Sequence, residues 1–95
     1  MALADGSVSK IRIHYWASAR AQVGVPAEEY ELVEGSLAEL LALVRRAHPE
    51  ADRLPALLDV CSYLIGDRPV GPSQVADVFV RAGDTVEVLP PFAGG

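Results

Sequence analysis

Alternating apolar and polar residues mark the first predicted strand of the chain. Over residues 10–16 every second side chain is bulky and apolar, and the intervening side chains are of a different character. The two sets are Ile11, Ile13 and Tyr15 on one side and Arg12, His14 and Trp16 on the other. Because successive side chains of a strand point to opposite faces, this pattern predicts a strand with one buried face.

A second strand is predicted over residues 28–33, near enough to the first to form a hairpin with a wide connection. The connecting segment contains a short helical turn that is stopped by Gly24 and Pro26. Glu28 and Glu29 fall on opposite faces of the second strand, so they do not form an acid–base pair.

The clearest predicted helix begins after Gly35, which we expect to break the second strand. Ser36 and Glu39 have the spacing of a capping box, in which each residue satisfies a backbone donor of the other. The apolar residues that follow recur at helical spacing and form one face: Leu37, Leu40, Leu41, Val44 and Ala47. Basic residues over 45–48 suit the carboxyl end of a helix, and Pro49 ends it.

The second half of the chain is predicted to consist mainly of strands. Residues 50–59 are ambiguous and allow a short second helix. Strands are expected over residues 60–66, over residues 78–80 as a short edge strand, and over residues 85–89. This order predicts an α+β fold of the β-grasp kind, a mixed four- to five-stranded sheet with one main helix packed on one face. The first and last strands would be parallel and central.

Length and charge narrow the class of protein further. Ninety-five residues suffice for one domain, here expected over residues 9–89, with a flexible arm over 1–8 and an extended tail over 90–95. A net charge of −5 disfavours nucleic acid and membranes as partners and favours a partner with a basic face. No apolar run is long enough to span a membrane, and the first residues lack the features of a signal peptide. We therefore expect a cytoplasmic protein.

Two sequence segments together resemble a known family. The segment after the first strand matches A-x-x-R-x-x-x-G, and the chain ends in GD-x-V-x-x-x-P-P-x-x-GG. The matching residues are Ala17, Arg20 and Gly24 in the first segment and Gly83, Asp84, Val86, Pro90, Pro91, Gly94 and Gly95 in the second. With the capped helix, these segments resemble the ThiS/MoaD family of sulfur carriers, bacterial relatives of ubiquitin. The Pro-Pro pair resembles the small subunit of molybdopterin synthase more than the shorter thiamine carriers.

The resemblance implies that the carboxylate of Gly95 is the catalytic group. A ubiquitin-activating-type adenylating enzyme would use ATP to form an acyl adenylate there, and a persulfide sulfur would replace AMP to give a C-terminal thiocarboxylate. The sulfur would pass to the large subunit of molybdopterin synthase or to another sulfur-accepting enzyme. The chain would then be a sulfur-donor subunit or co-substrate, with no bound cofactor, rather than a self-sufficient catalyst.

The residue types of the tail suit this role. Gly95 presents its carboxylate without a side chain, and Gly94 has the conformational freedom to pass through a narrow channel. The two prolines favour an extended path, which lowers the entropy lost when a partner captures the tail. Phe92 either anchors in an apolar pocket of the partner or folds back onto the domain. The residues expected to thread a partner's active site are Pro90, Pro91, Phe92, Ala93 and Gly94.

A docking surface is also predicted beside the tail. If the first and last strands are parallel neighbours, Trp16 and Leu89 lie at the same end of the sheet and point away from the core. An exposed aromatic and aliphatic patch there would suit partner docking, unless one of the two packs under the segment after the first strand.

Other candidate chemistry is weaker. Cys61 lies in an apolar strand, where a lone cysteine is usually a buried core residue. Because it is the only cysteine in the sequence, an intramolecular disulfide is excluded. His14 and His48 match no metal spacing, so no metal site is predicted. Asp84 is expected to bond local backbone in its turn.

Three alternatives to the molybdopterin setting remain open. The chain could carry sulfur for cysteine, thiamine or secondary-metabolite synthesis. It could be a ubiquitin-like modifier that conjugates to lysines through the same activated glycine. It could also be a non-catalytic β-grasp binding module, in which the terminal Gly-Gly is incidental.

Overall fold

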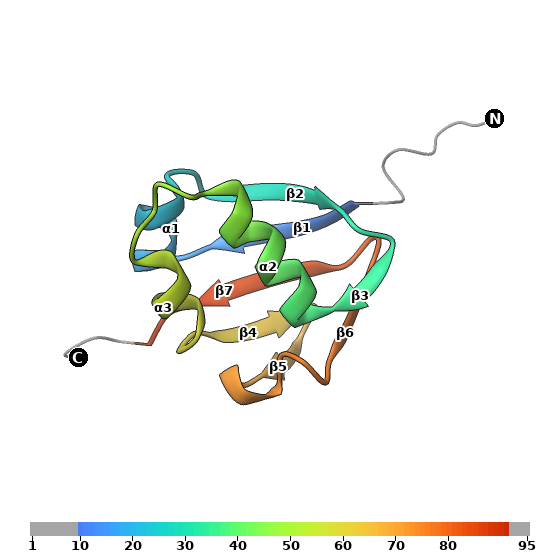
Figure 1. The fold of residues 1–95 in the computed structure, drawn as a ribbon. Helices are drawn as coiled ribbons and strands as arrows, with labels where there is room; N and C mark the ends of the chain where they lie inside the picture. Colours follow the sequence, from blue (N-terminus) through green and yellow to red (C-terminus); the bar gives the residue numbers. More distant parts are fainter. Residues whose placement is uncertain (1–9, 92–95) are drawn as a thin grey trace.

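The computed structural model describes residues 10–91, so the arm expected over 1–8 and the tail residues 92–95 lie outside the described residues. The elements, in chain order, are β1 (Lys10–Tyr15), α1 (Ala17–Val23), β2 (Ala27–Glu31), β3 (Glu34–Ser36), α2 (Leu37–Ala47), α3 (Leu54–Leu58), β4 (Ser62–Ile65), β5 (Arg68–Val70), a 3₁₀ turn (Pro72–Gln74), β6 (Phe79–Arg81) and β7 (Thr85–Leu89). Figure 1 shows α2 crossing the main sheet, with α1 and α3 at the end where β7 finishes.

The main sheet has five strands in the order β2-β1-β7-β4-β5. The first and last strands, β1 and β7, are parallel neighbours, and Arg12 lies beside Thr85 and Tyr15 beside Val88. β2 is antiparallel to β1, and β4 is antiparallel to β7. The predicted mixed β-grasp sheet with central, parallel first and last strands is therefore confirmed.

A single core lies between α2 and the sheet. The capping box at the start of α2 is present, since the Glu39 N–H donates to Ser36 Oγ at 3.0 Å and the Ser36 N–H donates to Glu39 Oε1 at 2.8 Å. The buried side chains come from the strands β1, β4, β5, β6 and β7 and from the helices α1, α2 and α3, and the largest are Tyr15, Tyr63, Ile11, Ile13, Leu37, Leu40, Leu41, Leu54 and Leu58. This core holds β7, and therefore the start of the tail, in the middle of the sheet.

The predicted role of Gly35 was wrong. The second strand ends at Glu31, and Gly35 lies in a separate short strand, β3, opposite Val80 of β6. A Cβ added at Gly35 would lie 2.5 Å from Glu39 Oε1. A side chain at Gly35 would therefore push the Glu39 carboxylate out of its capping-box position, so glycine here suits the cap and does not mark a break in the chain.

Two further strands differ from the prediction. The strand expected near 78–80 exists as β6, but it pairs with β3 in a second, two-stranded sheet and not at the edge of the main one. Residues 68–70 form the edge strand β5, which the turn signal Gly-Asp-Arg-Pro concealed. Pro69 within β5 is tolerated because an edge strand leaves one side unpaired. Within residues 10–91, no helix is long and apolar enough to cross a membrane.

Candidate functional site

The chain leaves the domain from its central strand. Leu89, the last residue of β7, lies opposite Ser62 of β4, and Pro90 and Pro91 follow. Since proline has no backbone N–H, these two residues end the hydrogen-bonded ladder and direct the chain away from the sheet. Pro91 is already exposed. The remaining predicted tail residues, Phe92, Ala93, Gly94 and Gly95, lie outside the described part of the chain.

Exposed apolar side chains gather where the tail begins. Trp16 is 51% exposed, Val60 53% and Val25 40%. The Trp16 N–H donates to the Val88 carbonyl at 3.3 Å, which fixes Trp16 beside the end of β7. Val25 comes directly before Pro26, whose carbonyl accepts the Tyr15 N–H, and Val60 comes two residues before Ser62, which lies opposite Leu89. We call this set the tail-root surface, and its members are Trp16, Val25, Val60, Leu89, Pro90 and Pro91.

The structure places the two predicted docking residues together at this end of the sheet. Leu89 is half-buried and on the outer face, while Trp16 is the more exposed of the two. Their arrangement is the one that the sequence predicted, and their role in docking stays a prediction.

The backbone after β1 turns sharply and fixes the orientation of Trp16. Ala17 has a φ of 48°, a left-handed conformation that is uncommon for a residue with a side chain. The Trp16 carbonyl then accepts the N–H groups of Ala19 and Arg20 at 3.0 and 3.2 Å, which starts α1. The Trp16 indole Nε1–H donates to Glu87 Oε1 at 2.7 Å. Both ends of this residue are therefore held.

Glu87 begins a string of polar contacts across the outer face of the sheet. His14 Nδ1 lies 3.1 Å from Glu87 Oε2, and Arg12 Nε donates to His14 Nε2 at 3.1 Å. Because the guanidinium can only donate, Nε2 must accept, and the ring proton is on Nδ1 and directed at Glu87. Arg12 also lies 3.5 Å from Glu29. This string fixes the face that adjoins the tail-root surface.

A hollow of about 330 Å³ opens beside Trp16 on the same face. Its lining residues combine an aromatic indole, two arginines and the small apolar side chains of a proline and an alanine, and they are Arg12, His14, Tyr15, Trp16, Arg20, Pro26 and Ala27. A concave, largely apolar site with a few polar groups is suited to receive one side chain of a docking partner.

A second polar cluster, on the inner face, was not predicted from the sequence. Glu28 Oε1 accepts the hydroxyls of Tyr15 and Tyr30, each at 2.8 Å, and His48 Nε2 lies 3.0 Å from both of its oxygens. Burial alone would raise the pKa of Glu28, but hydrogen bonds from His48, Tyr15 and Tyr30 outweigh it and lower that pKa. The clue in the sequence was that Glu28 and Tyr30 alternate onto the face that also carries the core residues.

The remaining predicted groups behave as structural residues. Cys61 is fully buried, and burial raises the pKa of its thiol to about 11, so it is not a thiolate nucleophile. Asp84 Oδ2 accepts the Arg81 N–H at 2.9 Å, which confirms its expected role in the turn. Across residues 10–91 no cluster of side chains has the composition to hold a metal ion.

Known proteins resemble the chain over nearly all of its length. The ThiS family model matches residues 13–95, including the whole tail. The chain belongs to the ThiS family. A molybdopterin synthase sulfur carrier subunit from Chlamydomonas reinhardtii is 31% identical over 87 residues, which cover 90% of this chain and 99% of the relative.

Solved structures of other proteins are similar in fold to this ThiS-family chain. A protein from Pyrococcus furiosus described as molybdopterin converting factor, subunit 1, has a TM-score of 0.68 and 26% identity, over 86% of this chain and 97% of the other. Small archaeal modifier protein 1 from Methanosarcina acetivorans has a TM-score of 0.67 and 14% identity, over 92% of this chain and 97% of the other. The second likeness shows a shared fold alone.

Proposed function

We propose that this protein is a sulfur carrier whose Gly95 carboxylate is converted to a thiocarboxylate, and that it serves as the small subunit of molybdopterin synthase. The observation that carries the proposal is the position of the tail in a ThiS-family chain. It follows the central strand, begins with two prolines and has the exposed Trp16 bonded beside its root. The molybdopterin setting is supported by the relative from Chlamydomonas reinhardtii.

The chemistry needs an activated carboxylate, because sulfide does not displace an oxygen from a carboxylate directly. In the proposed sequence, the Gly95 carboxylate attacks the α-phosphate of ATP, and pyrophosphate leaves. A persulfide sulfur then attacks the acyl carbon, the bond to AMP breaks, and reduction of the resulting acyl disulfide by a thiol leaves the thiocarboxylate. The described part of the chain contributes the stalk and the docking surface, while an adenylating enzyme of the ubiquitin-activating type contributes ATP.

Partner binding is assigned to the tail-root surface. Trp16 and Leu89 lie at the end of β7 from which the tail departs, so a partner that seats on them is placed to receive the tail. The prolines restrict the direction of that tail and reduce the entropy lost on capture. The same surface would serve the adenylating enzyme and the large subunit of molybdopterin synthase in turn, because each must reach the same glycine.

A ubiquitin-like modifier is the second candidate function. It is favoured by the fold shared with a small archaeal modifier protein, since both functions use the same activated C-terminal glycine. The two functions differ in the nucleophile that receives the activated glycine, which is sulfur for a carrier and an amine for a modifier.

A reconstituted synthase assay tests the molybdopterin setting. The thiocarboxylate form is mixed with the large subunit and the pterin precursor, and dithiolene product is measured per chain supplied. We expect product in proportion to the carrier, with none from a variant that lacks Gly95. A carrier that forms its thiocarboxylate but yields no product with this large subunit would assign the sulfur to another client.

A further inference from the structure

The end of the sheet opposite the tail carries a distinctive chemical group. Lys10 is the only lysine among the 95 residues, and the other seven basic side chains are arginines. A chain with an activated C-terminus is open to attack by amines, so the position of its one side-chain amine matters.

We propose that Lys10 is an acceptor site for the activated Gly95 of a second copy of this chain, so that two copies become joined by an amide bond. This inference rests on the proposed activation of Gly95, but it adds a modification site and names the group that is modified.

Lys10 is held on a rigid part of the fold. It is the first residue of β1, lies opposite Glu31 of β2, and accepts the Gly83 N–H on its carbonyl oxygen at 2.9 Å. The amine therefore projects from a fixed base beside the turn before β7, and not from a loop.

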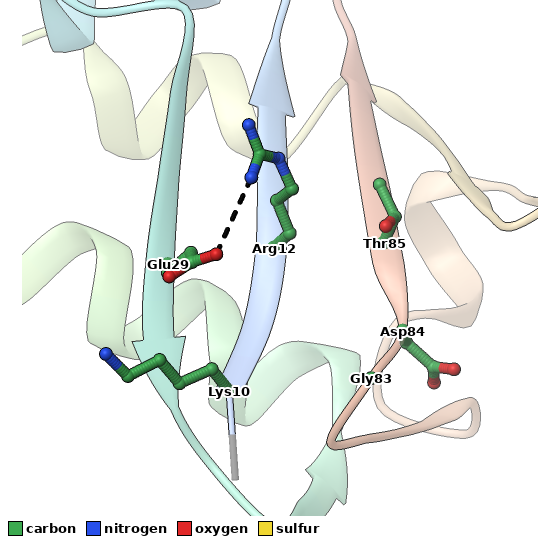
Figure 2. Close-up of a pocket in the computed structure, with 6 residues that line it drawn as sticks. All are labelled: Lys10, Arg12, Glu29, Gly83, Asp84 and Thr85. Atoms are coloured by element: carbon green, nitrogen blue, oxygen red, sulfur yellow. Dashed lines mark ion pairs between the residues drawn. The ribbon is translucent and has the colours of Figure 1, made fainter. Parts of the chain in front are cut away.

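A hollow of about 230 Å³ lies next to this lysine. Figure 2 shows its lining residues, which are Lys10, Arg12, Glu29, Gly83, Asp84 and Thr85. Gly83 has a φ of 95°, a left-handed conformation that favours glycine, and no atom lies within 4 Å of the place a Cβ would occupy. In Figure 2 the Lys10 side chain runs toward β2, away from Gly83, so a diglycine end would reach the amine from the β2 side of the hollow.

The carboxylates around the hollow are engaged elsewhere. Glu29 pairs with Arg12 at 3.5 Å, the contact drawn in Figure 2, and Asp84 Oδ2 accepts the Arg81 N–H. No ion pair within residues 10–91 includes Lys10. Figure 2 shows the side chains of Lys10 and Glu29 on the same side of β1, so Glu29 is the hollow carboxylate placed to accept the proton that the amine releases.

The geometry favours attack by another copy over closure of the chain on itself. Arg12 of β1 pairs with Thr85 of the parallel strand β7. Along the common strand direction, Lys10 lies two residues before this pair and Leu89 lies four residues after it. At the rise of a strand these positions are about 20 Å apart. The six residues after Leu89 span about 20 Å only when fully extended, and a tail that reversed direction after two prolines would fall short.

The reaction is an acyl transfer. The neutral Lys10 amine attacks the Gly95 carbonyl carbon of the acyl adenylate, a C–N bond forms, and the C–O bond to AMP breaks. AMP leaves with the bonding electrons, and the nitrogen releases its proton to a hollow carboxylate or to water. The product is an amide that links Gly95 of one copy to Lys10 of the other.

The test uses the full chain with a thioester on Gly95, which is activated without any partner enzyme. Wild-type chain, Lys10→Arg and the double variant Lys10→Arg with Arg46→Lys are incubated at mildly alkaline pH, and intact mass and peptide mapping locate the amide. The double variant keeps one lysine but moves it to an exposed position on α2, away from the hollow. We expect an amide-linked dimer from wild type, and at least about tenfold less from both variants.

Three results would overturn the proposal: no dimer from wild type, an equal yield from Lys10→Arg, or an equal yield from the relocated lysine. The last would show that any exposed lysine reacts and that the hollow contributes nothing. Thiocarboxylate formation by Lys10→Arg with the adenylating enzyme is measured separately. If Lys10→Arg still forms the thiocarboxylate, the carrier function stands whatever the outcome for Lys10. If neither wild type nor Lys10→Arg forms the thiocarboxylate, the result counts against the carrier function alone.

Discussion

Two carboxylates on opposite faces of the sheet are almost equally exposed, yet they do different work. The side chain of Glu28 is 24% exposed and that of Glu87 23%. Glu28 faces the helix side, where its donors come from β1, β2 and the residue after α2. Glu87 faces outward, and its partners are His14 of β1 and Trp16, the residue that follows β1.

The difference shows that partners, more than burial, determine what a half-buried carboxylate contributes. Glu28 joins three elements of the fold, and one of its donors, Tyr15, is only 1% exposed. Removing Glu28 would leave buried donors unsatisfied. Glu87 fixes one exposed indole beside the tail, so its removal would change the shape of a surface more than the stability of the domain.

The largest expected effect is on stability, from Glu28→Ala. We expect the free energy of unfolding to fall by about 2–4 kcal/mol, because two tyrosine hydroxyls and His48 lose their acceptor. Urea denaturation measures this, and Glu87→Ala should lose only about 1 kcal/mol or less. Glu29→Ala is the control, because Glu29 is the residue next to Glu28 in β2 but lies exposed on the outer face of the sheet. Equal losses for Glu28 and Glu87 would contradict the distinction between the two sites.

The next largest effect is on partner binding, from Trp16→Ala. We expect affinity for the adenylating enzyme to fall by about tenfold or more, because an exposed aromatic at the tail root is a natural anchor for a partner. Phe79, which is 59% exposed and lies on the second sheet, supplies the matched control Phe79→Ala. Titration calorimetry compares the two. If both variants bind like wild type, the tail-root surface is not the docking site.

The smallest expected effect is in acid. The lowered pKa of Glu28 means that the folded state binds fewer protons than the unfolded state, whose glutamate pKa is about 4.3. This stabilisation is complete above that value and is lost as the pH falls through the lower folded-state pKa. Between about pH 5 and about pH 3, Glu28→Gln should therefore lose less stability than wild type. Parallel curves for the two proteins would remove Glu28 as a source of acid sensitivity.

The sequence was sufficient to predict the centre of the sheet and the strand from which the tail leaves the domain. The alternation of apolar and polar residues in β1 and β7 is a local pattern, and so are the capping box and helical apolar spacing of α2. Each pattern depends only on residues within its own element or next to it. Trp16 and Leu89 could be placed together because parallel neighbouring strands end at the same edge of a sheet.

Features that depend on long-range pairing could not be predicted in the same way. Gly35 looks like a strand breaker until β6, over forty residues later, pairs with it. The Glu28 cluster needs His48 from the end of α2, and the string from Trp16 to Arg12 needs Glu87 from the last strand. No local pattern encodes such contacts, since they exist only once the elements have packed.

The most direct test of the central claim is the intact mass of the protein after incubation with its adenylating enzyme, ATP and a persulfide donor. The account predicts the mass gain of one sulfur in place of one oxygen, located by fragmentation at Gly95. It also predicts no gain in a variant that lacks Gly95, although that variant should still bind the enzyme through Trp16. An adenylated chain that never acquires sulfur, or sulfur found at Cys61 in place of Gly95, would contradict the account.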